Sequence, residues 1–282
     1  MSQSIRKLVF TMVSTSWWLT PIVAQIHHGT AIVAASDATS VLIAADSREN
    51  TDGVASDYCK IAISGNSVIG IANVSGVKRV RFVDFFTHSE AFRRPLSAQQ
   101  FHAAALGWGN QVKDFLETEM REHRMHQIGA GNLITSAIFY ETDQEKRLLS
   151  VNVVIRATPQ ETKARSNIVV AVSDGIVIHP DGEHAVYAIG HAGVLTWNEL
   201  LTARTSRAQA QQRIVRDLVM PGGSLATRSK GAEELITLAS SWYPEEVSPP
   251  IAEITISGDG PVWKAKTPAC LIWNPVSATL TR

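Results

Sequence analysis

Residues 29–48 read GTAIVAASDATSVLIAADSR, and this stretch decides the fold. Two runs of small, β-branched and aliphatic residues, 30–36 and 41–46, flank the short polar turn 37–40. Runs of this length, bounded by a polar turn, are typical of strands that are buried on both faces. The segment therefore predicts a buried β-hairpin.

The rest of the chain alternates between strand-like and helix-like patterns. The expected elements are strands 61–64 and 68–72 turned by Gly65-Asn66, helices 77–88 and about 97–119, strands of a second sheet at 133–141, 148–155, 168–172 and 184–189, helices 208–220 and 232–242, and a strand at 251–257. Ser97 and Gln100 predict a capping box at the start of the long helix. This order is best buried as two stacked, mainly antiparallel sheets with helices on both outer faces, an α+β four-layer αββα sandwich.

Thr30, Asp46 and Lys60 carry the chemistry that the opening segment suggests. A threonine hydroxyl is a poor nucleophile near neutral pH unless a base removes its proton, and a free α-amino group can be that base. The reference pKa of that amine, about 7.7–8.0, leaves much of it neutral near pH 7. Inside a peptide bond the same nitrogen has no basicity. The hypothesis therefore predicts cleavage of the bond between Gly29 and Thr30.

These residues also have ordinary structural explanations. Thr30 suits a strand because it is β-branched, and Lys60 could protect a strand edge. Asp46 and Arg48 could form a purely structural ion pair across a turn. We favour the nucleophile for Thr30 and keep the ion pair open.

Composition narrows the function classes. The chain has 282 residues, 45% of them hydrophobic, which is enough for one large core and a single domain. Its 26 basic and 26 acidic residues balance, so no strong positive field draws it to nucleic acid. Cys59 and Cys270 are too few for a disulfide framework or a zinc site, and we favour two buried thiols over a single bridge.

The first 24 residues differ from the rest. Arg6 and Lys7 precede a mostly apolar run, which fits a secretory signal peptide ending at Ala24. Residues 25–29 would then be a short pro-segment and 30–282 the domain, with an extension from about 258. A self-removed propeptide of a cytosolic enzyme is the alternative. The signal peptide predicts a secreted or periplasmic protein, and the propeptide predicts a cytoplasmic one. No other segment is apolar enough to span a bilayer in the mature form.

Three segments carry a family likeness: Gly29–Val33, Val41–Arg48 and Cys59–Ile61. They resemble the opening of proteasome-type subunits, which belong to the N-terminal nucleophile hydrolases. The resemblance is dense to Gly76, agrees in element order to about Ser257 and is absent beyond. It implies the αββα fold, with Thr30 as the nucleophile and, once freed, the bearer of the basic amine.

The same resemblance assigns supporting roles. Lys60 would lie near the Thr30 hydroxyl and favour its deprotonated form, with Asp46 holding Lys60 and Arg48 bracing that loop. Ser75-Gly76 matches the position whose backbone N–H forms the oxyanion hole. Glu245 and Ser248 fall where the family places an aspartate and a serine that support the terminal amine.

The second half departs from the family pattern. Gly190-His191-Ala192 stands where active subunits usually have a serine between two glycines, so an imidazole replaces a hydroxyl near the nucleophile. His191 is either a packed residue or a substitute for that hydroxyl. Pro249-Pro250 replaces a pair usually occupied by glycines and removes two backbone donors.

No metal or organic cofactor is expected. His27 and His28 are adjacent on an extended segment and point to opposite sides, which suits a linker better than a metal site. Glu119, His123 and His126 lack a zinc-binding spacing and belong to a solvated helix end.

The resulting hypothesis is a proteasome-like N-terminal threonine hydrolase that cleaves peptide or amide bonds. Two alternatives remain: an inactive, self-associating scaffold of the same fold, and an amidase acting on small amides. Because proteasome-type subunits usually form rings, the resemblance also suggests a ring-like homo-oligomer.

Overall fold

The computed structural model describes residues 30–37, 39–51, 54–77, 80–121, 133–158, 167–172, 177–178, 185–220 and 223–271. The expected signal peptide 1–24, the pro-segment 25–29 with Gly29, and His123 and His126 lie outside these ranges. Over the described residues, no helix combines the length and the apolar composition needed to cross a membrane.

The opening hairpin is confirmed and forms the centre of the first sheet. β1 (Ile32–Ser36) and β2 (Val41–Asp46) are buried at every position and pair antiparallel. The sheet continues with β13 (Ala185–Ile189) beside β1, and with β14 (Ile251–Ser257) and the edge strand β15 (Gly260–Ala265) beyond β2. All four pairings are antiparallel. Thr30 and the end of β2 therefore lie at the same end of this sheet.

The second sheet is also antiparallel. Its order is β11 (Asn167–Val172), β10 (Leu148–Thr158), β9 (Leu133–Thr142), β6 (Ser67–Asn73) and β5 (Ile61–Ser64), with β12 (Val177–Ile178) pairing β10. The expected hairpin at 61–72 thus joins the second sheet, whereas the strand expected there at 184–189 joins the first. Alternation along the chain identifies a strand, but non-local pairing decides which sheet it enters.

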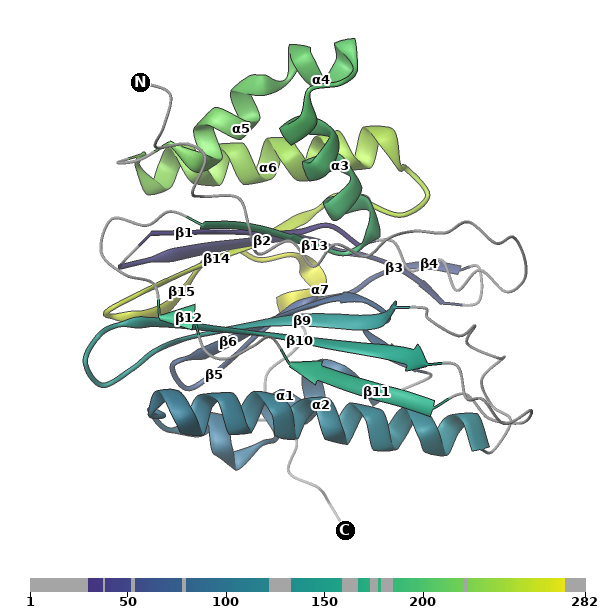
Figure 1. Ribbon diagram of the computed structural model, residues 1–282, viewed down its shortest axis with the longest axis vertical. Helices are drawn as coiled ribbons and strands as arrows, with labels where there is room; N and C mark the ends of the chain where they lie inside the picture. The colour runs from purple at the N-terminus through teal and green to yellow at the C-terminus, as the bar shows by residue number, and fades with distance from the viewer. Residues whose placement is uncertain are drawn as a thin grey trace.

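Helices cover the outer face of each sheet (Figure 1). The first sheet carries α3 (His191–Thr202), α4 (Ser206–Ala210), α5 (Gln212–Val219) and α6 (Leu225–Trp242), and the second carries α1 (Phe82–Thr87), the short helix Glu90–Arg93 and α2 (Ala98–Arg121). Three buried apolar clusters separate these layers. The molecule is an α+β sandwich of two antiparallel sheets with helices.

Several expected helix boundaries were wrong. The range 77–88 begins with the small hairpin of β7 (Gly76–Val77) and β8 (Val80–Arg81) before α1 starts. The range 208–220 is interrupted at Gln211, whose backbone leaves the helical region. The capping box is confirmed, since Gln100 N donates to Ser97 Oγ and Ser97 N to Gln100 Oε1.

Several further elements were not anticipated. They are the β3–β4 hairpin (Arg48–Thr51 and Val54–Asp57), the short helix Glu90–Arg93, strand β12, helix α3, strand β15 and the short helix α7 (Pro268–Leu271). The last of these lies between the two sheets (Figure 1). The extension expected from about residue 258 is therefore built into the domain as far as Leu271.

The expectation of two free thiols was wrong, because Cys59 and Cys270 form a disulfide with Cα atoms 4.9 Å apart. β15 and α7 carry the C-terminal end of the described chain back to the start of β5, which no local pattern reveals. The bridge ties that end of the chain to the residue before Lys60.

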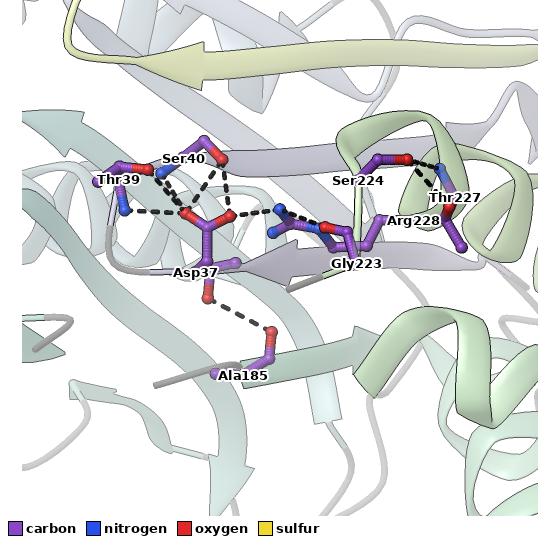
Figure 2. Close-up of polar contacts among 9 residues, drawn as sticks. Asp37, Thr39, Ser40, Ala185, Gly223, Ser224, Thr227 and Arg228 are labelled. Atoms are coloured by element: carbon purple, nitrogen blue, oxygen red, sulfur yellow. Dashed lines mark hydrogen bonds and ion pairs between the residues drawn. The ribbon is translucent and has the colours of Figure 1, made fainter. Parts of the chain in front are cut away.

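An ionic contact joins the β1–β2 turn to the start of α6 (Figure 2). Asp37 accepts hydrogen bonds from the backbone N–H groups of Thr39 and Ser40, both at 2.8 Å, and pairs with the buried guanidinium of Arg228. Ser224 caps α6 by accepting from Thr227 N. The turn and the helix that covers the first sheet are thereby fixed to one another.

Candidate active site

Thr30 lies at the start of β1 and is 1% exposed. The next residue fixes it to the end of β2: Ala31 N donates to Asp46 Oδ1 at 2.9 Å, and Asp46 N donates to Ala31 O at 3.1 Å. On the other side Gly193 N donates to Thr30 O at 3.4 Å. The threonine is thus held between the end of β2 and the first turn of α3.

Lys60 and Asp46 form a buried ion pair. Lys60 Nζ lies 3.0 Å from both carboxylate oxygens of Asp46, and the two side chains are 1% and 0% exposed. Burial raises the pKa of Asp46, while the Lys60 ammonium and the amides of Ala31 and Arg48 act in the opposite direction. The carboxylate therefore links the charge of Lys60 to the backbone beside Thr30.

The structural ion pair kept open for Asp46 and Arg48 is not what these side chains make. Arg48 contacts Asp46 through its backbone N–H, at 3.0 Å from Oδ2. Its guanidinium instead donates from Nη1 to Pro244 O at 2.8 Å. Arg48 thus braces the end of β2 against the segment that follows α6.

Ser75 and Gly76 follow β6 on the neighbouring sheet. Ser75 O accepts from Tyr58 Oη at 3.2 Å and from Phe82 N at 2.8 Å. A Cβ on Gly76 would meet Val80 O at 2.5 Å, so contact with β8 already requires glycine here. The glycine is therefore explained by its contact with β8, independently of the oxyanion-hole role that the resemblance implies for its N–H.

Gly190 approaches Thr30 more closely than any side chain would allow. A Cβ at Gly190 would lie 2.0 Å from Thr30 O and 3.1 Å from Thr30 Cβ. Its φ of 85° is also unfavourable for other residues. Gly190 is the N-cap of α3, so His191, the first residue of that helix, follows directly.

His191 is held by contacts from two directions. Its backbone N donates to Asn73 Oδ1 at 3.2 Å, and its Nδ1 lies 3.0 and 2.9 Å from the two oxygens of Glu246. Glu246 is 6% exposed, whereas the imidazole is partly open to solvent. The hydrogen bond to Glu246 raises the pKa of His191, with burial acting against it.

Glu245 and Ser248, the two residues expected to support a terminal amine, lie in the segment that follows α6. Glu245 is exposed, and its neighbour Glu246 is the buried carboxylate that meets His191. Ser248 Oγ donates to Pro249 O at 3.0 Å, within its own loop. Two adjacent acidic residues in a turn face different sides, and sequence alone could not choose between them.

Sequence reasoning also missed Asn73 and Gly193. Asn73 has a φ of 66°, a conformation that asparagine tolerates better than most residues, but its position at the end of a strand gave no signal. Among the described residues, no group of three or more His, Cys, Asp or Glu side chains converges as a metal site would require.

No protein-family model matches this chain, and a search of curated proteins gives no match either. Among solved structures, Thiobacillus denitrificans BPH in complex with epoxomicin is 13% identical, with 81% of this chain and 98% of that chain covered and a TM-score of 0.42. A further structure of Thiobacillus denitrificans BPH is 14% identical, with the same coverage and a TM-score of 0.41. A Gly-1 mutant of Anbu from Hyphomicrobium sp. strain MC1 is 16% identical, with 85% and 86% covered and a TM-score of 0.48. Similarities this low do not assign the chain to a family.

Proposed function

We propose that this chain is an N-terminal threonine hydrolase, which cleaves peptide or amide bonds through an acyl-enzyme on Thr30 after removal of residues 1–29. The observation that carries the proposal is the buried pair of Lys60 and Asp46. Asp46 accepts a hydrogen bond from the backbone N–H of Ala31, the residue that follows Thr30. A buried ion pair is weak support for stability, because desolvation offsets its attraction. A buried cation that is linked through a carboxylate to the residue next to a threonine does, however, suit a nucleophile that must lose a proton.

The proposed reaction uses groups of the chain and water. The freed amine of Thr30 takes the proton of the side-chain hydroxyl, by way of a water molecule, and the oxygen attacks the substrate carbonyl carbon. The Lys60 ammonium stabilises the developing negative charge on that oxygen, and the backbone N–H of Gly76 donates to the oxyanion. The amine leaves, and water then hydrolyses the ester on Thr30.

Processing follows from the same chemistry. Before cleavage, the Thr30 hydroxyl attacks the Gly29 carbonyl carbon and shifts the acyl group from nitrogen to oxygen. Hydrolysis of that ester releases residues 1–29, or 25–29 after removal of a signal peptide, and frees the amine.

Location and assembly belong to the same proposal. The disulfide between Cys59 and Cys270 favours an exported protein, since such bridges persist in oxidising compartments. A ring-like homo-oligomer and a peptide substrate are proposed from the family resemblance. A small-amide substrate is compatible with the same residues, and a substrate screen separates the two.

The second candidate is an inactive scaffold of the same fold. Two observations favour it: Ser248 binds its own loop, and Glu245 is exposed. An exposed carboxylate and a hydroxyl that donates within its own loop are weaker support for a terminal amine than buried groups facing it would be. The scaffold predicts an intact bond between Gly29 and Thr30.

The first test is the intact mass and N-terminal sequence of the protein from its native host. A chain that begins at Thr30 is the expected result, and one that begins at Gln25 would favour the scaffold. Thr30→Ser should still be processed and Thr30→Ala should not, because serine keeps the hydroxyl that makes the acyl shift and alanine has no side-chain nucleophile. Equal processing of both variants would mean that another protease makes the cut.

A further inference from the structure

His191 and Glu246 form a carboxylate–imidazole pair at the residue that follows the Gly190 contact with Thr30. Three elements fix the pair. Asn73 Oδ1 holds the backbone of His191 from the second sheet. Glu246 N donates to Tyr243 O, and Arg48 holds the neighbouring Pro244 to the end of β2. The pair is therefore anchored to the same structures as Thr30.

The orientation of the pair decides what the imidazole can do. A carboxylate can only accept hydrogen bonds, so the neutral imidazole must carry its proton on Nδ1, facing Glu246. Proton exchange with anything else then takes place at Nε2. A buried carboxylate that binds Nδ1 both fixes the ring and stabilises its protonated form, which is the arrangement used by histidines that transfer protons.

The reaction proposed above leaves the proton donor to the departing amine open, since either the α-ammonium of Thr30 or a second acid can supply that proton. The α-amine of Thr30 becomes protonated when it takes the hydroxyl proton, but the nitrogen of the substrate must gain a proton as its bond to carbon breaks. An amine is a poor leaving group until that proton arrives. A positioned acid contributes about 10²–10⁴-fold to such a step.

Resting on the proposed function, we propose that His191 is the acid that protonates the leaving amine and that Glu246 is its positioning residue. In acylation the bond from Thr30 Oγ to the acyl carbon forms, the C–N bond breaks, and Nε2 of His191 gives its proton to the departing nitrogen. In deacylation the neutral Nε2 takes a proton from the attacking water, and the α-ammonium returns its proton to Thr30 Oγ. Protons balance over the cycle.

The groups around the imidazole are compatible with this role. Glu246 faces Nδ1, the ring of Tyr243 lies edge-on with centroids 6.5 Å apart, and the preceding residue, Gly190, makes the close contact with Thr30. The partly exposed imidazole can regain a proton from solvent between turnovers. A purely structural histidine would explain the contacts but would not make catalysis depend on the leaving group.

The test compares two substrates that share one acyl group, an alkyl amide and a 4-nitrophenyl ester. Nitrophenolate leaves without gaining a proton, whereas the amine must gain one in order to leave. The parameter kcat/KM reports the steps up to acylation. For His191→Gln and His191→Ala we expect kcat/KM to fall about 10²-fold or more with the amide and less than about threefold with the ester. His88→Ala, an exposed histidine at the end of α1, is the matched control and should change neither.

Glu246→Gln tests the role through the pH dependence of kcat/KM for the amide, which would not change if the pair were purely structural. Amide cleavage needs protonated His191, so kcat/KM falls as the pH rises through its pKa. Without the carboxylate that limb of the profile should move to lower pH. Equal losses with amide and ester, or no loss with either, would overturn the role of His191. A wild-type protein that cleaves neither substrate would overturn the proposed function, and this role with it.

Discussion

At Gly190 the backbone has no room for a side chain. The nearest atom to an added Cβ would be Thr30 O at 2.0 Å, and φ is 85°. We expect Gly190→Ala to lower the free energy of unfolding by more than about 2 kcal/mol, since strain and a backbone clash add. Gly107→Ala is the control, because a Cβ there meets nothing within 4 Å, and it should stabilise helix α2 by about 0.4–1 kcal/mol. Denaturant unfolding measures both, and similar effects would contradict the contact between Gly190 and Thr30.

The ion pair of Lys60 and Asp46 is buried and can be compared with a more exposed ion pair. Lys60→Met leaves the Asp46 carboxylate buried without its ammonium, which should cost about 3–5 kcal/mol of stability. Lys113→Met removes a partly exposed pair with Glu117 at 3.8 Å and should change stability by less than about 0.5 kcal/mol. Chemical denaturation of both variants checks this. A loss from Lys60→Met no larger than that from Lys113→Met would mean that the buried pair is solvated.

Single residues were predicted well where the chain brings them together by short steps. Asp46 ends the second strand of the first hairpin and Lys60 precedes β5, only 14 residues later, and the family resemblance implied the contact that the structure shows. The contact between His191 and Glu246 spans 55 residues and depends on how α3 and the segment after α6 pack. Nothing in the local pattern distinguishes Glu246 from Glu245.

The contact between the β1–β2 turn and α6 can be tested through pH. The amide hydrogen bonds and Arg228 outweigh burial and hold the pKa of Asp37 at about 2, below its usual 3.8. A carboxylate whose pKa is lowered by folding stabilises the fold fully at pH values above its pKa in the unfolded chain. This contribution is lost as the pH falls from 3.8 towards 2. We expect Asp37→Asn to cost about 1–2 kcal/mol at pH 7, a figure reduced for partial solvent screening.

Stability measured from pH 7 down to pH 2 should therefore show the wild type and Asp37→Asn converging at the acid end. Asp259→Asn, in the exposed turn between β14 and β15, is the control and should track the wild type throughout. A constant difference between Asp37→Asn and wild type would mean that the charge of Asp37 contributes nothing.

Elements whose signals are local were the ones that sequence predicted. The first hairpin and the capping box of α2 depend on neighbours within a few residues, and both are confirmed. The hairpin of β7 and β8 and the break at Gln211 were missed because the apolar periodicity continues across them. Gly76 packs against β8, and Gln211 is the C-cap of α4. The hydrophobic pattern predicts neither of these features.

At the scale of the whole molecule, sequence predicted two sheets and helices but not the exchange of strands between the sheets. β13 lies beside β1, more than a hundred residues away in the chain, and β5 with β6 lies beside β9. Strands buried on both faces have similar apolar sequences, so composition cannot assign them to a sheet. The return of the chain to Cys59 was missed because 211 residues separate the two cysteines and no local pattern joins them.

That return closes most of the domain into one loop, since 211 residues separate Cys59 from Cys270. Loss of the bridge should lower the free energy of unfolding by about 2–5 kcal/mol, because the unfolded chain regains freedom. Cys59→Ser, Cys270→Ser and the double variant should lose nearly the same amount, since each breaks the same bond. Dithiothreitol should lower the melting temperature of the wild type but not of the variants. Losses that add in the double variant would mean that the two cysteines contribute separately and that no bridge joins the end of the chain to the residue before Lys60.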